Sequence, residues 1–189
     1  MTLYADQELA ALLQDQESQL VERKRSGADR SGIRKNICAF ANDLPGTGKP
    51  GVIFVGVEND GGCAGIQVDD ELLRTLAQIR SDGNILPLPS MTVEKKTIHE
   101  CDVAAIQVEP AANPPVRYQG RVWVKVGPTV QQATPEEEQR LTERRRSGYS
   151  ASRAWRKPRT AWVWLWPLMN RAIKAGSSSG NNRLLGLAT

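Results

Sequence analysis

An acidic turn follows the most apolar segment of the chain. Residues 51–57, GVIFVGV, are β-branched and aromatic and are bounded by glycine and proline, a pattern typical of a strand covered on both faces. The next residues, ENDGG, place the carboxylates of Glu58 and Asp60 where that strand would end. Loops at strand ends often carry functional residues, so this turn is the first candidate site.

A second candidate is a strand with one basic and aromatic face. In residues 121–126, RVWVKV, a period of two predicts Val122, Val124 and Val126 in the core, with the alternate side chains on the opposite face. Lysine and arginine bind phosphates and aromatic rings stack on unpaired bases, so that face is predicted to bind nucleic acid. The predicted contacts are Lys24, Arg25, Lys49, Arg117, Tyr118, Arg121, Trp123 and Lys125. The alternative is an ordinary outer face with Trp123 packed under a helix.

The glycine-rich stretch around Lys49 does not match a nucleotide phosphate loop. The phosphate-loop motif requires a glycine five residues before Gly48, where Asp43 stands, and a Ser or Thr after Lys49, where Pro50 stands. The stretch also precedes a predicted strand and opens no helix, so no helix N-terminus is available for a phosphate. A solvated loop, with Lys49 able to touch a nucleic-acid backbone, is the remaining interpretation.

The elements that would position these residues alternate between helices and strands. Apolar residues at helical spacing predict a helix over residues 3–16, one carrying Ile33 and Ile37, and one after Asp69. Asp29 or Ser31 is the predicted cap of the second helix, and Thr134 with Glu137 forms a predicted capping box for a last helix. Strands are predicted within residues 17–25 and near residues 51–57, 91–96, 103–109 and 121–126, with a hairpin turn at 99–102. The fold class is therefore α/β (α+β), with a mixed sheet and flanking helices.

Charge divides the chain into a body and a tail. Residues 144–189 hold ten of the 25 Lys and Arg residues and none of the 21 Asp and Glu residues, so the tail is +10 and the body, with 15 basic and 21 acidic residues, is −6. We expect a domain at residues 1–146 and a basic, Trp-rich tail at 147–189 that is disordered or non-native. No apolar stretch is long enough to cross a membrane and no signal peptide is visible, so a cytoplasmic protein with reduced, buried cysteines is expected.

Four motifs resemble a known family. In order and spacing, ESQLVERK, ICAFAND, VIFVGVENDGGCAGI and PPVRYQGRVWVKVGPTVQQATPEEEQRL are similar to the Schlafen AlbA-type DNA-binding domain, over roughly residues 8–146. The resemblance implies the front domain of a bacterial transcriptional regulator, helicase-related or ATP-binding protein. The ATPase-like part expected downstream has no counterpart in this sequence, so ATP binding is not expected.

The resemblance also implies an alternative activity. Some relatives resemble metal-dependent endoribonucleases, whose three acids correspond to Glu17, Glu22 and the position of Asn59. Asp60 or Glu58 could replace the third acid only if the turn shifts by one residue. Glu17 and Glu22 are five residues apart, which puts them on opposite faces of a regular strand unless Glu17 precedes it. Together with Asp60 they could bind magnesium or manganese and activate water for phosphodiester hydrolysis. Another departure is Arg23, which stands where the family usually has phenylalanine.

The function predicted first is therefore a nucleic-acid-binding module, for DNA or RNA, of a regulator-like protein. The metal-dependent nuclease is the first alternative. The second is an oligomerisation module in which the first helix and a sheet edge join subunits into a homo-oligomer. No cofactor is expected apart from magnesium or manganese under the nuclease alternative.

Overall fold

The structure is a computed structural model that describes residues 3–14 and 18–154. The chain divides into two compact units, Met1–Tyr149 and Ser150–Thr189, and every strand of the described residues belongs to the first unit. In chain order the elements are α1 (Asp6–Gln14), β1 (Val21–Lys24), α2 (Arg30–Asn42), β2 (Gly51–Val55), α3 (Asp70–Gln78), β3 (Ile85–Leu86), β4 (Met91–Ile98), β5 (Cys101–Val108), β6 (Arg117–Tyr118), β7 (Arg121–Val126), β8 (Thr129–Gln132) and α4 (Pro135–Ala154).

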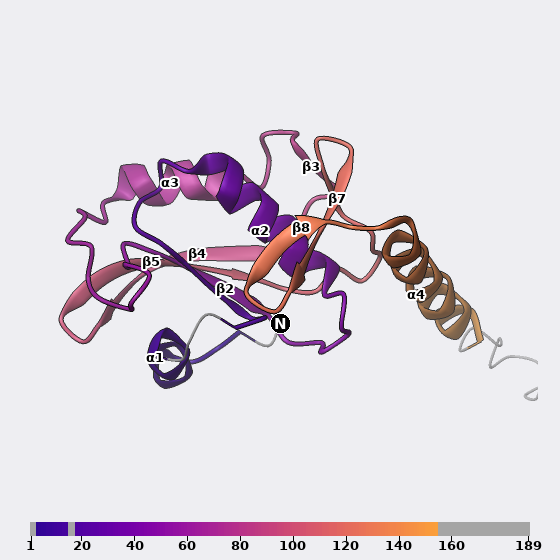
Figure 1. The fold of residues 1–189 in the computed structure, drawn as a ribbon, viewed down its shortest axis with the longest axis horizontal. Coiled ribbons are helices and arrows are strands. Elements are labelled where there is room, and N and C mark those ends of the chain that lie inside the picture. Colours follow the sequence, from indigo (N-terminus) through magenta and orange to yellow (C-terminus); the bar gives the residue numbers. More distant parts are fainter. Residues whose placement is uncertain (1–2, 15–17, 155–189) are drawn as a thin grey trace, which may run out of the picture. The chain divides into compact units, whose positions relative to one another are not determined.

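Four strands form a mixed sheet in the order β1-β2-β5-β4 (Figure 1). β1 is parallel to β2, with Val21 opposite Val52, whereas β5 is antiparallel to both β2 and β4. His99 and Glu100, at φ 48° and 62°, form the two-residue hairpin turn between β4 and β5. The turn is shorter than predicted because β5 already begins at Cys101. A mixed sheet with flanking helices confirms the predicted α+β fold class.

Both faces of this sheet are covered, so every residue of β2 is buried. One face, with Ile53 and Ile106 directly opposite each other, packs against Ile33 and Ile37 of α2 and Leu76 of α3. The other face, with Val52 and Phe54, packs against Leu9 and Leu13 of α1. Figure 1 shows α1 on one side of the sheet and α2 and α3 on the other. Burial on both sides explains why β2 is continuously apolar and shows no alternation.

β2 ends two residues earlier than predicted. Gly56 has a φ of 104°, a left-handed conformation that side-chain-bearing residues rarely adopt, so the strand stops at Val55. A Cβ at Gly56 would also lie 3.3 Å from the carbonyl oxygen of Asp102. Val57 then forms only an isolated bridge with Cys63, across the acidic turn.

The helix starts follow the sequence signals. The Asp29 carboxylate accepts a hydrogen bond from Gly32 N–H at the start of α2, and Asp69 accepts one from Leu72 N–H at the start of α3. In the capping box, Thr134 N–H donates to Glu137 and Glu137 N–H donates to the Thr134 hydroxyl. The predicted Asp29 cap and the predicted capping box are confirmed. Among the described helices none is long and apolar enough to cross a bilayer.

A second sheet, in the order β3-β6-β7-β8, leans on the other side of α2. The Asn42 side chain at the end of α2 bonds to the backbone of Val116 and Trp123. Leu141 of α4 joins Val122 and Val124 of β7 in a small core of its own. Arg144 of α4 donates to the carbonyl oxygens of Asp43 (2.6 Å) and Leu44 (2.9 Å), which follow the C-terminus of α2.

The expectation of three reduced, buried cysteines is wrong for two of them. Cys63, in the turn after β2, and Cys101, the first residue of β5, form a disulfide. Cys63 is exposed, while Cys101 is buried. Spacing in the sequence could not reveal this pair, since the sheet brings together residues 38 positions apart. Cys38 is the free cysteine and lies in the core of α2.

We expect Cys38 to be the one cysteine that reacts with thiol reagents only after unfolding. Burial raises the pKa of its thiol to about 11, and the reactive thiolate is therefore rare at pH 8. Titration with an aromatic disulfide reagent at pH 8 should detect no fast thiol in the native, non-reduced protein and one thiol in urea. After mild reduction, Cys63 should react before Cys38. Fast labelling of Cys38 in the native protein, identified by peptide mapping, would contradict its buried position.

Candidate functional site

Burial along β7 differs from the predicted two-faced pattern. Arg121 is exposed and Trp123 is half-buried, but Lys125 retains only 3% of its surface, whereas Val126 is 47% exposed. The prediction that Val126 faces the core and that Lys125 lies on an open face is therefore wrong. α2 covers the face that carries Trp123 and Lys125, and the small core with α4 covers the opposite face. A strand covered on both faces cannot be oriented by alternation alone.

Lys125 ties the second sheet to the first. Its Nζ donates to the carbonyl oxygen of Val21 (2.8 Å) and to Oε2 of Glu22 (2.7 Å), and lies 5.0 Å from the centroid of the Phe40 ring. An ammonium enclosed by an acid, a carbonyl and an aromatic face is fully engaged by the protein itself. Lys125 is therefore a structural residue and is unavailable to an external phosphate.

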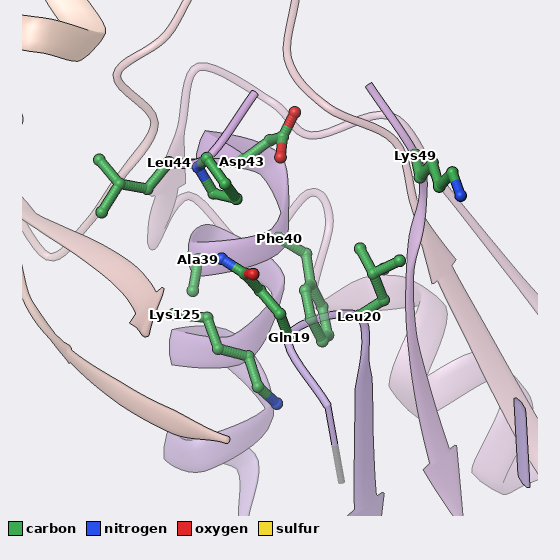
Figure 2. A pocket seen from close by; sticks show the side chains of 10 residues that line it. Gln19, Leu20, Ala39, Phe40, Asp43, Leu44, Lys49 and Lys125 are labelled. Carbon is green, nitrogen blue, oxygen red and sulfur yellow. The ribbon is translucent and has the colours of Figure 1, made fainter. Parts of the chain in front are cut away.

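The hollow beside Lys125 is too small for a ligand. It is lined by Gln19, Leu20, Phe40, Lys49 and Lys125 among others, and its volume of about 10 Å³ is that of a single water molecule. Figure 2 shows Lys125 and Lys49 on opposite sides of the Phe40 ring. Gly51 also lines the hollow, and a Cβ there would lie 2.1 Å from Cγ of Phe40. Phe40 thus packs directly on the backbone of β2, and the hollow is a packing feature.

Two carboxylates of the predicted metal site, those of Glu22 and Asp60, are engaged by other groups of the protein. Oε1 of Glu22 pairs with Lys24 (3.2 Å) while its Oε2 binds Lys125, and Asp60 accepts a hydrogen bond from Gly62 N–H within its own turn. Glu17 lies outside the described residues. Among the described residues no three His, Cys, Asp or Glu side chains are grouped as a metal site. Two ammonium groups at Glu22 would repel a divalent cation, so the side chains in place do not fit magnesium or manganese there.

Two other predicted contacts are directed into the protein. Tyr118 is only 6% exposed and belongs to the core beside α2, so the prediction that its ring offers a stacking surface is wrong. The Tyr118 ring is buried because it lies in the same core cluster as Ile37 and Cys38 of α2. Arg117 is half-buried and binds Glu138 of α4 (3.0 Å) and the carbonyl oxygen of Gly120. Its guanidinium links the second sheet to α4.

Besides Arg121, three predicted cations reach the surface. Lys49 is exposed in the loop before β2, and Arg25 is 77% exposed but pairs with Glu58 at 3.0 Å. Lys24 is 22% exposed and pairs with Glu22 and with Asp29 (3.3 Å). Burial lowers the pKa of Lys24, but the attraction of Glu22 and Asp29 outweighs it, so the net shift is upward. Lys24 is therefore firmly charged.

Lys35 of α2 was not among the predicted contacts. Its signal in the sequence was the basic pair Arg34 and Lys35 between Ile33 and Ile37. Its Nζ lies 4.4 Å from the centroid of the Trp123 ring. The pKa of the nearby Asp29 carboxyl is lowered mainly by the hydrogen bond from Gly32 N–H, against the opposing effect of burial, and further by Lys24 and Lys35. We call Lys24, Lys35 and Arg121 the cationic stripe: Lys24 pairs with Asp29, the charge of Lys35 acts on the same carboxyl, and Lys35 covers Trp123, which shares a strand face with Arg121.

Arg23 also has a clear structural role. It faces the α1 side of the sheet beside Phe54 and is only 6% exposed. Its guanidinium donates to the carbonyl oxygen of Leu13 near the end of α1 (2.8 Å) and to that of Asn59 in the acidic turn (3.2 Å). An arginine at this position therefore fastens α1 and the turn to the sheet, and the departure from phenylalanine is structural.

Comparison with known proteins identifies the family. Residues 17–134 match the family model described as Schlafen, AlbA_2, while no curated protein matches the chain. Among solved structures the chain is similar to the DIP2311 protein from Corynebacterium diphtheriae, with 23% identity, a TM-score of 0.43, 61% of this chain covered and 25% of that one. It is also similar to the N-terminal domain of a putative ATP-dependent DNA helicase RecG-related protein from Nitrosomonas europaea, with 19% identity and a TM-score of 0.49. That match covers 70% of this chain and 95% of the other. The chain spans about a quarter of the DIP2311 chain. Since the family model covers more than half of its residues, this protein belongs to the Schlafen AlbA_2 family.

Proposed function

We propose that this chain is a nucleic-acid-binding module that holds the phosphate backbone with the cationic stripe. The observation that supports this most is that the charges of Lys35 and Arg121 are not neutralised by a neighbouring carboxylate of the described residues. Within the described part of the chain, neither forms an ion pair with a carboxylate, and they flank the one tryptophan of residues 1–146. Membership of the Schlafen AlbA_2 family supports the same function.

The net charge of the body requires such a local site. With a charge of −6, residues 1–143 repel polyanions in general, so binding depends on a place where cations prevail. Around the stripe, Lys24, Lys35, Arg121 and the underlying Lys125 outnumber the acids Glu22 and Asp29. By this proposal the domain works in a regulator-like cytoplasmic protein, and phosphate contacts supply most of its affinity.

Charge removal in the stripe tests the proposal. The double variant Lys35→Ala/Arg121→Ala should bind a labelled oligonucleotide about tenfold more weakly, and its slope of log affinity against log salt should be shallower by about 2. The measurement is fluorescence anisotropy with the full chain, on DNA and RNA, from about 50 to 300 mM salt. The full chain keeps the basic tail constant across the variants.

The matched control removes two cations elsewhere. Arg74 is exposed on α3, and Lys95 lies on β4, at the opposite edge of the first sheet from β1. Arg74→Ala/Lys95→Ala changes the net charge equally and should leave the affinity close to that of the parent chain. Equal losses of affinity in both double variants would mean that only net charge matters and would refute the binding role of the cationic stripe. Manganese-dependent cleavage that disappears in Glu22→Gln would instead favour the nuclease.

A further inference from the structure

We propose that the stripe selects single-stranded nucleic acid, with an unpaired base stacked on Trp123 and the flanking phosphates held by Lys35 and Arg121. This inference rests on the proposed function and adds the class of partner. Its basis is the arrangement of four side chains on two strands and one helix: Trp123 and Arg121 on β7, Gln132 on β8 and Lys35 on α2.

Trp123 is placed as a stacking platform. The side chain is half-buried against the core beside α2, which holds the indole in position, and the Lys35 ammonium lies over the ring, 4.4 Å from the centroid. A rigidly held ring loses little conformational freedom when a base stacks on it. Its Nε1–H is buried and has no hydrogen-bond acceptor among the described residues, which is uncommon for a tryptophan inside a protein.

Lys35 can exchange the ring for a phosphate. Its ammonium makes no hydrogen bond or ion pair with another described residue, so the ring is its contact. A lysine on a flexible four-carbon stem can swing aside when a base slides over the ring, and then meet the adjacent phosphate. Base stacking on an aromatic side chain contributes more than a cation–π contact at an exposed site, so the exchange favours binding.

The neighbours of Trp123 suit a single strand. Gln132 lies directly opposite Trp123 in the β7–β8 pair, which puts both side chains on one face, and Gln132 is exposed. Its amide can donate to and accept from a base edge, and Arg121, two residues along β7, can hold the next phosphate. In a duplex each base is stacked between its neighbours and cannot lie on the ring, so a duplex would use only the phosphate contacts.

The test separates bases from phosphates. The full chain is titrated with a labelled thymidine oligonucleotide of about 15 nucleotides, an abasic oligonucleotide of the same length and charge, and a duplex. The parent chain should bind the thymidine strand at least about tenfold more tightly than the abasic strand. Trp123→Leu should remove most of that preference, whereas Trp123→Phe should keep part of it. Thermal denaturation checks that each variant is folded, and Trp123→Phe keeps the test valid if Trp123→Leu is not.

Two further variants make the outcomes distinct. Trp162→Leu removes a tryptophan of the tail and should leave the preference unchanged, while Lys35→Ala should lower affinity for both strands and keep the preference. If base preference is absent, or equal in the parent chain and Trp123→Leu, while Lys35→Ala/Arg121→Ala still weakens binding, the single-strand inference fails and the proposed function survives. If the double variant binds as the parent chain does, both fail.

Discussion

Lys125→Ala is expected to lower the free energy of unfolding by about 3–5 kcal/mol, as when one partner of a buried ion pair is removed. Lys125 is nearly inaccessible to solvent. Its ammonium donates hydrogen bonds to the Val21 carbonyl oxygen and the Glu22 carboxylate and makes a cation–π contact with the Phe40 ring. Its loss leaves a largely buried carboxylate with Lys24 as its remaining cation and opens a cavity between the sheets. Urea denaturation followed by circular dichroism measures the change.

Two controls give this prediction its meaning. Lys95→Ala removes an exposed lysine that pairs with Asp102 at 2.7 Å, and should cost no more than about 1 kcal/mol. Lys125→Met/Glu22→Leu, which replaces the pair with apolar residues of similar volume, should recover most of the stability. A Lys125→Ala protein of normal stability that has lost nucleic-acid binding would instead show that this lysine is a ligand contact. Binding loss in an unfolded variant says nothing about contacts.

Asn42→Ala should lower the free energy of unfolding by a similar amount, because it leaves three backbone groups without a hydrogen-bond partner. The Asn42 amide donates to the carbonyl oxygens of Val116 (3.0 Å) and Trp123 (2.8 Å), and its Oδ1 accepts from Val116 N–H (2.7 Å). Each buried group left without a partner costs about 1–3 kcal/mol, so a total of about 3–5 kcal/mol is expected. Urea denaturation gives the stability, and amide exchange should show Val116 N–H losing protection before the strands of the first sheet.

Asn36→Ala is the matched control on the same helix. Asn36 is equally buried, but its amide donates only to Gly32 one turn earlier, so its loss should cost about 1 kcal/mol. Equal costs at the two positions would refute the idea that Asn42 joins the second sheet to α2. A larger loss at Asn42, confined to the second sheet in amide exchange, would establish it.

The elements were largely predictable because their signals are local. Asp29, Asp69 and the Thr134–Glu137 pair satisfy helix N–H groups within a few residues, and hydrophobic periodicity follows from burying one face of a helix. Family membership was also readable from four motifs in their order, and the match over residues 17–134 confirmed it. The site was less predictable, since alternation in β7 is the same whether its basic face meets water or a helix.

The sequence by itself determined the α+β class, the helix starts, the buried central strand and the family, because each depends on residues close together in the chain. Only the tertiary structure decided which cations are free. In the folded protein Lys125 is buried between the sheets and Arg117 forms an ion pair with Glu138. Cys63 forms a disulfide with Cys101, and Lys35 lies over Trp123, which is 88 residues further along the chain. The physical reason is that burial and ion pairing depend on partners distant in sequence, and those partners are supplied by how α2 lies between the two sheets.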